Sequence, residues 1–279
     1  MIDDLLAAEA YWWVFYGGTV LVFLLMVEVG FLLGRWRKDK LDPEVKSQAG
    51  TALAAILGLL GFLLAISFGI AENRFMMRKQ LVLQEANSIG TTFLRTGFLT
   101  GSDRDKARRL LAEYVDVRLK AVRTRRIREG LKRSSEIQNQ LWKIADAAAA
   151  QRPRAVTVGL FIDSLNQTID LNEERVTVGL RYRVPPSLLW TLYLVAFLSM
   201  GVLGFHFGLG GTRNFLAASA LVVAFAAVML LIVDLDQPRQ HLFTVSQGPL
   251  VDTQQFIHKS LEKDPGKSGN APDRGGQSP

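Results

Sequence analysis

The side chains that could bind ions are a few carboxylates at the ends of long apolar runs. Glu28 lies near the end of one run, and Asp234 and Asp236 close another. Carboxylates in such positions could bind a cation at a pore mouth. The structural alternatives are that Arg35, two helical turns later, satisfies Glu28, and that the two aspartates are exposed and unpaired beside Arg239. The sequence leaves both interpretations open.

No combination of residues indicates enzymatic chemistry. The chain has no cysteine, which excludes disulfides, thiolate metal sites and a cysteine nucleophile. His206, His241 and His258 lack the spacing of a metal site, and the GxSxG, Walker and HExxH motifs are absent. We therefore expect no catalysis, no metal and no cofactor. His206 falls inside an apolar run, where it is either an interhelical hydrogen-bond donor or a proton relay.

The sequence contains four long apolar runs, near residues 10–33, 50–71, 184–212 and 214–233. The carboxylates named above and His206 lie within these runs or next to them. Each run is long enough for a membrane-spanning helix, which needs about 20 residues. The run 50–71 contains no charge, and its helical periodicity continues through Leu81, Glu85, Ile89 and Phe93. The sequence thus predicts an all-α, multi-pass membrane protein whose second span continues as a long helix into water.

Small and bulky residues lie on separate faces of the second span. A neighbouring helix could approach closely along a small-residue strip, whose members are Gly61, Ala65 and Gly69. The adjacent apolar strip consists of Gly58, Phe62 and Ile66. Its bulky residues either pack against other helices or close a pore by dewetting. In the first span, Gly30 and Gly34 have the same spacing as the small-residue strip and predict another close helix contact.

Residues 72–183 hold 22 Lys and Arg against 13 Asp and Glu, a net charge of +9. Their apolar periodicity predicts a helical bundle, with helices beginning near Ser102, after Ser134 or Ser135, and near residue 154. The densest basic run, from Arg118 to Arg133, is either a solvated surface or a site for anionic lipid headgroups. We expect no nucleic-acid binding, because no aromatic stacking residues alternate with these charges.

These patterns divide the chain into six regions. They are 1–49, the first span and a basic loop; 50–98, the second span and its extension; 99–183, a helical bundle; 184–234, the third and fourth spans; 235–262, a segment with a short amphipathic helix at 250–261; and 263–279, a disordered tail.

A set of motif residues resembles the bacterial bestrophin-like membrane family, which is related to bestrophin channels. The resemblance covers most of residues 12–262 and includes the later PPS and DLDQP segments. Its residues are Gly61, Phe62, Asn73, Arg74, Phe75, Arg78, Glu85, Ala86, Asn87, Gly90, Leu94 and Arg95.

The resemblance implies a homo-oligomeric ion channel in the cell membrane, most simply a pentamer that conducts small ions. Bestrophins carry a narrow hydrophobic neck on their second membrane helix, which corresponds here to Phe62 or to Ile66 one turn later. The basic residues that flank the spans are nearly balanced between the two sides, so their count does not set the orientation. The resemblance implies that the bundle and both termini are cytosolic. The alternative is a non-conducting scaffold or sensor whose basic bundle binds anionic lipid or a protein partner.

Overall fold

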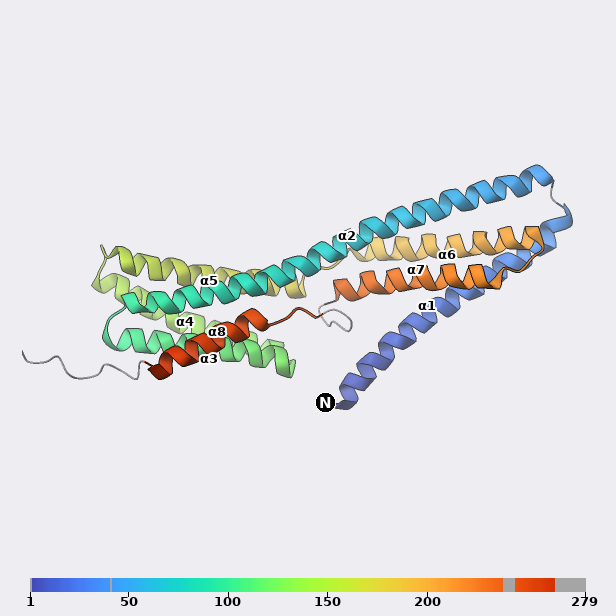
Figure 1. The fold of residues 1–279 in the computed structure, drawn as a ribbon. Coiled ribbons are helices and arrows are strands. Elements are labelled where there is room, and N and C mark those ends of the chain that lie inside the picture. Colours follow the sequence, from blue (N-terminus) through green and yellow to red (C-terminus); the bar gives the residue numbers. More distant parts are fainter. Residues whose placement is uncertain (1, 41, 238–243, 264–279) are drawn as a thin grey trace, which may run out of the picture. The chain divides into compact units, whose positions relative to one another are not determined.

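The computed structural model describes residues 2–40, 42–237 and 244–263, and all regular secondary structure within these ranges is helical (Figure 1). The helices are α1 (Ile2–Arg37), α2 (Pro43–Arg95), α3 (Gly101–Thr124), α4 (Ile127–Gln151), α5 (Val156–Leu180), α6 (Pro186–Gly210), α7 (Phe215–Asp236) and α8 (Gly248–Lys263). The predicted all-α class is confirmed. The predicted disordered tail lies outside the described residues, except for Lys263, which ends α8.

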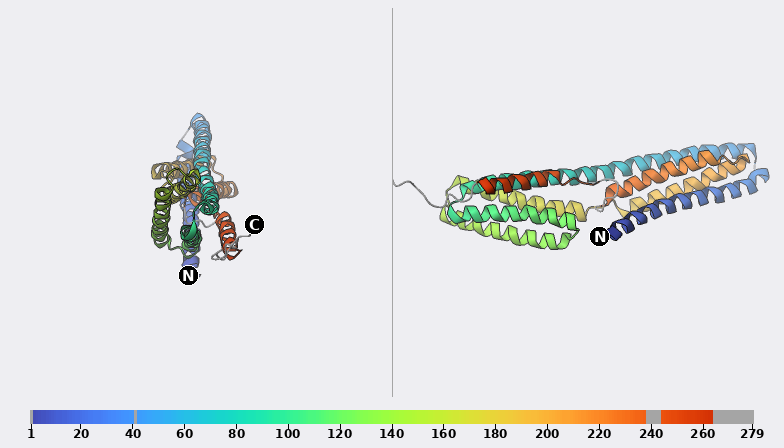
Figure 2. Two further views of the ribbon diagram at one scale, coloured as in Figure 1. Left: turned by 90° about the vertical axis from the view of Figure 1, so that its left-hand side faces the viewer. Right: turned by 60° about the horizontal axis from the view of Figure 1, so that its bottom comes forward.

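The chain divides into two compact units. The membrane unit comprises the described residues of Met1–Met77 and Val178–Val245, and the extramembrane unit comprises those of Arg78–Thr177 and Ser246–Pro279. Helices α2 and α5 contribute residues to both units because each continues past the boundary. Figure 2 shows the same helices from two further directions.

Four helical segments are long and apolar enough to cross a membrane. They are Trp13–Lys40, Glu44–Phe98, Pro186–Gly210 and Phe215–Asp236. Helix α2 has 53 residues, about 80 Å at 1.5 Å per residue, whereas a hydrocarbon core is about 30 Å thick. Only part of α2 therefore spans the bilayer, and the uncharged stretch 50–71 fits that part. Glu85 lies 14 residues beyond Ala71, about 21 Å further along the helix.

Helices α1 and α6 approach each other through glycines in the membrane unit. A Cβ atom added at Gly204 would overlap the carbonyl oxygen of Val27, and one added at Gly30 would overlap that of Gly201. A Cβ at Gly34 would likewise overlap the backbone of α6. Only glycine permits such close backbone contact. The contact predicted at Gly30 and Gly34 is confirmed, with α6 as the partner.

The extramembrane unit is a bundle of α3, α4, most of α5 and the end of α2. The predicted start of α4 at Ser134 or Ser135 is wrong, because α4 begins at Ile127 and Ser134 is buried within it. Arg125 caps the end of α3 and has a left-handed backbone with φ 58°. One turn into α4, Gly130 lies against Ala121 so closely that a side chain would not fit. These features form a tight hairpin between α3 and α4.

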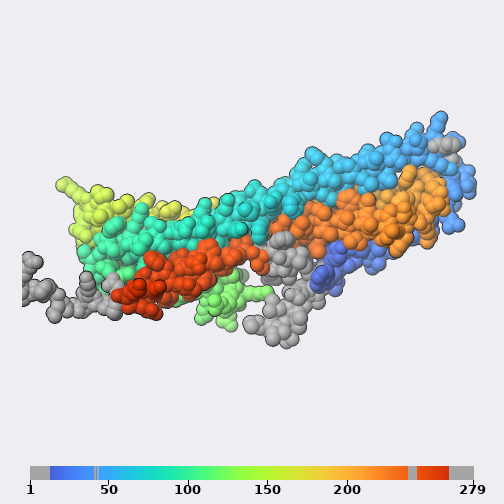
Figure 3. Space-filling model, viewed as in Figure 1, coloured from blue at the N-terminus to red at the C-terminus, as the bar shows by residue number. Residues whose placement is uncertain are grey.

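Helix α8 packs against the bundle through contacts to α2 and α3 (Figure 3). Thr253 donates a hydrogen bond to the carbonyl of Ala86 at 3.3 Å, and Gln254 donates one to Asp116 at 2.6 Å. The ring of Phe256 meets that of Phe93 edge to face, with 5.9 Å between centroids. The C-terminal helix is thus an integral part of the extramembrane unit.

Candidate functional site

The predicted constriction residues lie on the side of α2 that faces away from the core of the membrane unit. The side chains of Phe62 and Ile66 are 62% and 42% exposed, and a Cβ at Gly58 would meet open space. The opposite side of α2 contributes to the core through Leu53, Leu60, Leu64 and Ala71. Membrane helix α2 therefore presents an apolar face that no described residue of its own chain covers.

The small-residue strip of Gly61, Ala65 and Gly69 is exposed as well. A Cβ built on Gly61 or Gly69 would have no neighbour within 4 Å among the described residues. This contrasts with the glycines of α1 and α6, which pack closely inside the same unit. The strip has no partner helix in this part of the single chain, so its predicted packing role stays a prediction.

The motif residues that follow on α2 have several different environments. Asn73 and Asn87 are exposed, whereas Arg78 is buried. Arg95 donates a hydrogen bond to the carbonyl of Leu160 at 2.7 Å and lies 3.5 Å from the carboxylate of Asp163. Arg95 thus anchors the end of α2 to α5 within the extramembrane unit.

Glu85 is the centre of a buried ionic cluster in the extramembrane unit. Its side chain is fully buried, and Arg118 Nε lies 2.9 Å from its Oε1 atom. Arg175 Nη1 pairs with the Oε2 atom, and Tyr114 donates a hydrogen bond to Oε1 at 3.3 Å. Arg175 also donates to the side chain of Gln247, just before α8, at 2.6 Å. One carboxylate therefore connects α2, α3, α5 and the start of the C-terminal segment.

The charges of this cluster determine its protonation. Burial raises the pKa of Glu85, but the positive charges of Arg118 and Arg175 outweigh this effect and hold the pKa below its ordinary value of 4.5. Burial also raises the pKa of the Tyr114 phenol, and the neighbouring Glu85 carboxylate raises it further. At neutral pH, Glu85 is consequently a carboxylate and Tyr114 is a neutral hydrogen-bond donor.

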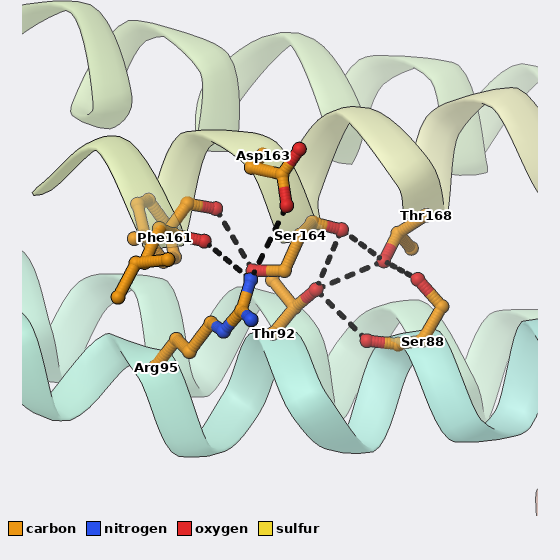
Figure 4. A network of polar contacts seen from close by, with 8 residues as sticks. Ser88, Thr92, Arg95, Phe161, Asp163, Ser164 and Thr168 are labelled. Atoms are coloured by element: carbon orange, nitrogen blue, oxygen red, sulfur yellow. Dashed lines mark hydrogen bonds and ion pairs between the residues drawn. The ribbon is translucent and has the colours of Figure 1, made fainter. Parts of the chain in front are cut away.

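A second buried polar group joins α2 to α5 through hydroxyls (Figure 4). The Oγ1 atom of Thr168 lies 2.8 Å from the Ser88 hydroxyl and 2.9 Å from the Thr92 hydroxyl. The Thr92 hydroxyl also lies 2.9 Å from the backbone carbonyl oxygens of Ser88 and Ser164, and its single proton can be donated to one of them at a time. Each hydroxyl has a partner, so burying the group carries no penalty for an unsatisfied donor. No sequence pattern indicates this group, because its hydroxyls come from two helices and lie 76 and 80 residues apart in the chain.

Asp234 and Asp236 are buried, so their interpretation as exposed, unpaired carboxylates is wrong. Asp236 accepts a hydrogen bond from the backbone N–H of Val184 at 2.7 Å and lies 4.0 Å from Arg74 Nη1. Arg183 donates to its backbone carbonyl at 3.3 Å. The acidic end of α7 therefore fixes the chain just before α6. Asp236 also lines a cavity of about 530 Å³.

Glu28 has a different ion-pair partner from the one expected from the sequence. Its carboxylate pairs with Arg213, 2.9 Å from Nη2, and the proposed pairing with Arg35 is not the one found. The guanidinium of Arg213 lies over the ring of Phe31, 4.6 Å from its centroid. Arg213 belongs to the short connection between α6 and α7, and its side chain reaches Glu28 on α1. The two residues are 185 positions apart in the sequence, so sequence spacing could not predict their contact.

Histidine and acidic side chains do not gather into a metal centre in the part of the chain that the structure describes. His206 packs against Gly50, with its Cε1 atom 3.2 Å from where a Cβ would lie. Its Nδ1 atom is buried and has no hydrogen-bond partner among the described residues. Neither proposed role for His206 is tested by this geometry.

Comparison with known proteins places the chain in a family. The model of the bestrophin-like domain matches residues 20–250. None of the curated proteins compared with the chain matches it. Among solved structures, a bacterial bestrophin homologue from Klebsiella pneumoniae has a TM-score of 0.59 at 17% identity, covering 88% of this chain and 96% of its own.

A crystal structure described as a membrane protein has a TM-score of 0.61 at 15% identity and covers 92% of this chain and 99% of its own. A second structure of the Klebsiella pneumoniae homologue has a TM-score of 0.60 at 17% identity, covering 89% and 99%. At these identities the structures show a shared fold. Since the family model spans most of the sequence, the chain is a multi-pass member of the bestrophin-like family of membrane proteins.

Proposed function

We propose that this protein is a homo-oligomeric ion channel whose axial pore is lined by the exposed face of α2 in the membrane unit. The observation that carries the proposal is the contrast between the two sides of α2. The residues on one side of α2 belong to the same buried core as residues of α1, α6 and α7. On the other side, Gly58, Phe62 and Ile66 are exposed. Family membership supports the proposal, because the related bestrophins are channels.

The exposed face gives a physical means of gating. A ring of Phe62 and Ile66 side chains would leave no polar group to replace the hydration shell of an ion, so the constriction would stay dry until the helices moved. The neighbouring strip of Gly61, Ala65 and Gly69 would allow α2 helices of adjacent copies to approach closely. A pentamer is the assembly favoured by the resemblance to bestrophins.

The ionisable groups of the membrane unit would act outside the constriction. Asp236 ends α7 beside Arg74 and Arg183, and Glu28 pairs with Arg213 at the connection between α6 and α7. We place the first group on the cytosolic side, together with the extramembrane unit and both termini, in a bacterial inner or plasma membrane. The net charge of +9 over 72–183 would influence which ions reach the pore.

Reconstitution into planar bilayers tests the proposal. The wild type should conduct, and replacing Phe62 and Ile66 together by alanine should raise the open probability or the leak current several-fold, because the dry constriction widens. The matched control is Leu194→Ala with Leu198→Ala, an exposed pair at the same spacing on α6. This control should conduct like the wild type.

The rival function is a non-conducting scaffold or sensor. It would be preferred if purified oligomer stayed silent across voltage, pH and ion type while both alanine pairs behaved alike. Native mass spectrometry in mild detergent provides a separate check of assembly. A monomer under all gentle conditions would remove the basis for a pore between subunits.

A further inference from the structure

We infer that the groove between α3 and α4 is a binding site for an organic phosphate, an anion that combines a phosphate group with an apolar part. The groove is open to solvent and has a volume of about 370 Å³ in the extramembrane unit. This is within the size range of small-molecule sites, about 300–1,000 Å³. Its lining residues are Lys106, Arg109, Leu110, Glu113, Gln140, Lys143 and Ile144. The site lies outside the membrane unit and is independent of the proposed pore.

The charge of the groove is the first argument. Lys106, Arg109 and Lys143 contribute three positive charges, and none of them forms an ion pair within residues 2–40, 42–237 and 244–263. All three side chains are exposed at the groove, so an anion can reach them from solvent without displacing a protein counter-ion. Phosphate suits such a site because it accepts several charge-assisted hydrogen bonds at once.

The single carboxylate of the groove does not cancel this charge. Glu113 accepts hydrogen bonds from Arg133, whose Nε and Nη2 atoms lie 2.8 Å and 2.6 Å from its Oε1 atom. Arg133 also pairs with Glu136 at 3.0 Å. Arg133 is shared by two carboxylates and offsets only part of the charge of Glu113, so the three cations and this one carboxylate give the groove lining a net charge of +2. The two lysines and Arg109 remain available to an anion.

The apolar lining is the second argument. Leu110 from α3 and Ile144 from α4 are both half-buried and lie among the three cations. Inorganic phosphate would use the cations but leave these side chains in contact with water. A ligand with an apolar group beside its phosphate would cover them and gain hydrophobic free energy. The lining thus favours an organic phosphate over the inorganic ion.

Two sources could supply this chemistry, a soluble phosphate monoester and a lipid with a monoester headgroup. Phenyl phosphate is a minimal soluble probe, and phosphatidic acid is the matching lipid. The full chain in phosphatidylcholine nanodiscs should bind phenyl phosphate saturably and at least about 10-fold more tightly than inorganic phosphate. If phosphatidic acid in the disc weakens this binding more than an equal charge of phosphatidylglycerol does, the natural source is the lipid. If the two lipids act alike, the source is soluble.

Charge reversal assigns the binding to the groove. Lys106→Glu with Lys143→Glu should weaken phenyl phosphate binding by about 10-fold or more, since each lost cation removes a charge-assisted contact. The control is Lys120→Glu with Arg128→Glu, which changes the net charge equally at exposed positions of the same two helices outside the groove. The control should bind within about twofold of the wild type.

Circular dichroism and size-exclusion chromatography would first establish that both double variants fold and assemble. The inference is overturned if the wild type binds neither phenyl phosphate nor inorganic phosphate saturably. An equal loss of binding in the groove variant and the control would also overturn it, because the effect would then arise from net charge.

Discussion

Glu85 is a buried carboxylate that holds two arginines from different helices of the extramembrane unit. Replacing it by glutamine would leave the guanidinium groups of Arg118 and Arg175 buried without their counter-charge. Breaking a buried pair in this way costs about 3–5 kcal/mol of unfolding free energy. The apparent melting temperature of Glu85→Gln in detergent should therefore fall well below that of the wild type.

Glu113→Gln is the matched control, since it removes a carboxylate that also pairs with an arginine but is 42% exposed. Water screens such a pair, so the melting temperature should change little. Equal melting temperatures for Glu85→Gln and the wild type would show that the buried cluster contributes no stability.

The lowered pKa of Glu85 predicts how this contribution depends on pH. A carboxylate with a folded pKa below its ordinary value of 4.5 binds fewer protons when folded, so its stabilisation is complete above that value. The stabilisation is lost as the pH falls through the folded pKa. The gap in unfolding free energy between the wild type and Glu85→Gln should be constant from about pH 8 to 5 and shrink below about pH 4. Denaturant titrations at several pH values measure this gap.

The buried cluster shows what sequence could and could not predict about single residues. Glu85 was selected through its motif, but its burial and both arginine partners were not predicted. Arg118 and Arg175 lie 33 and 90 positions away, and sequence spacing predicts only neighbours within one helix. For the same reason Arg35 was assigned to Glu28 in place of the distant Arg213. Periodicity also gave no indication that the aspartates ending α7 are buried.

At the scale of elements, the contact between α1 and α6 leaves no room for a side chain at its glycines. Gly204→Ala would place a methyl group on the carbonyl oxygen of Val27, forcing the two helices apart. We expect a loss of stability at or above the upper end of the range of about 1–3 kcal/mol for over-packing. Gly18→Ala on α1, where a Cβ meets nothing within 4 Å, should melt like the wild type.

Thermal unfolding of the two glycine variants in the same detergent provides this comparison. A wild-type melting temperature for Gly204→Ala would mean that the glycines are not needed for helix contact. The spacing of Gly30 and Gly34 predicted a close contact, but the sequence did not identify α6 as the partner. The same four-residue spacing at Gly61, Ala65 and Gly69 has no partner within the described chain, so spacing alone does not distinguish contacts within a subunit from contacts between subunits.

Helix starts were predicted less well than helices. All four spans and the helical bundle were expected from apolar periodicity and length. The start of α4 was placed seven or eight residues too late because Ser134 and Ser135 resemble capping residues. Arg125 instead caps α3 in a left-handed conformation that usually requires glycine or asparagine. Tertiary contact between Gly130 and Ala121 therefore determines the hairpin more than local capping does.

At the scale of the whole molecule, α2 supplies residues to both compact units. Its apolar face at Gly58, Phe62 and Ile66 is uncovered in one unit, while Glu85 and Thr92 are buried in the other. A motion of the extramembrane unit that rotated or tilted α2 would thus act directly on the proposed constriction. This arrangement gives the proposed channel a single element that joins its pore to its ionic cluster.

The central claim is that the α2 face lines an ion pathway, and the absence of cysteine from the chain permits a direct test. Single cysteines at Phe62 and Ile66 would be the only thiols present, as would a control cysteine at Leu194 on the exposed surface of α6. Currents are recorded in planar bilayers while a charged, membrane-impermeant thiol reagent is added. We expect rapid modification that changes the current through Phe62→Cys and Ile66→Cys and leaves Leu194→Cys unaffected. Unchanged currents in both α2 variants, with mass spectrometry showing neither thiol modified in conducting channels, would contradict a pore lined by α2.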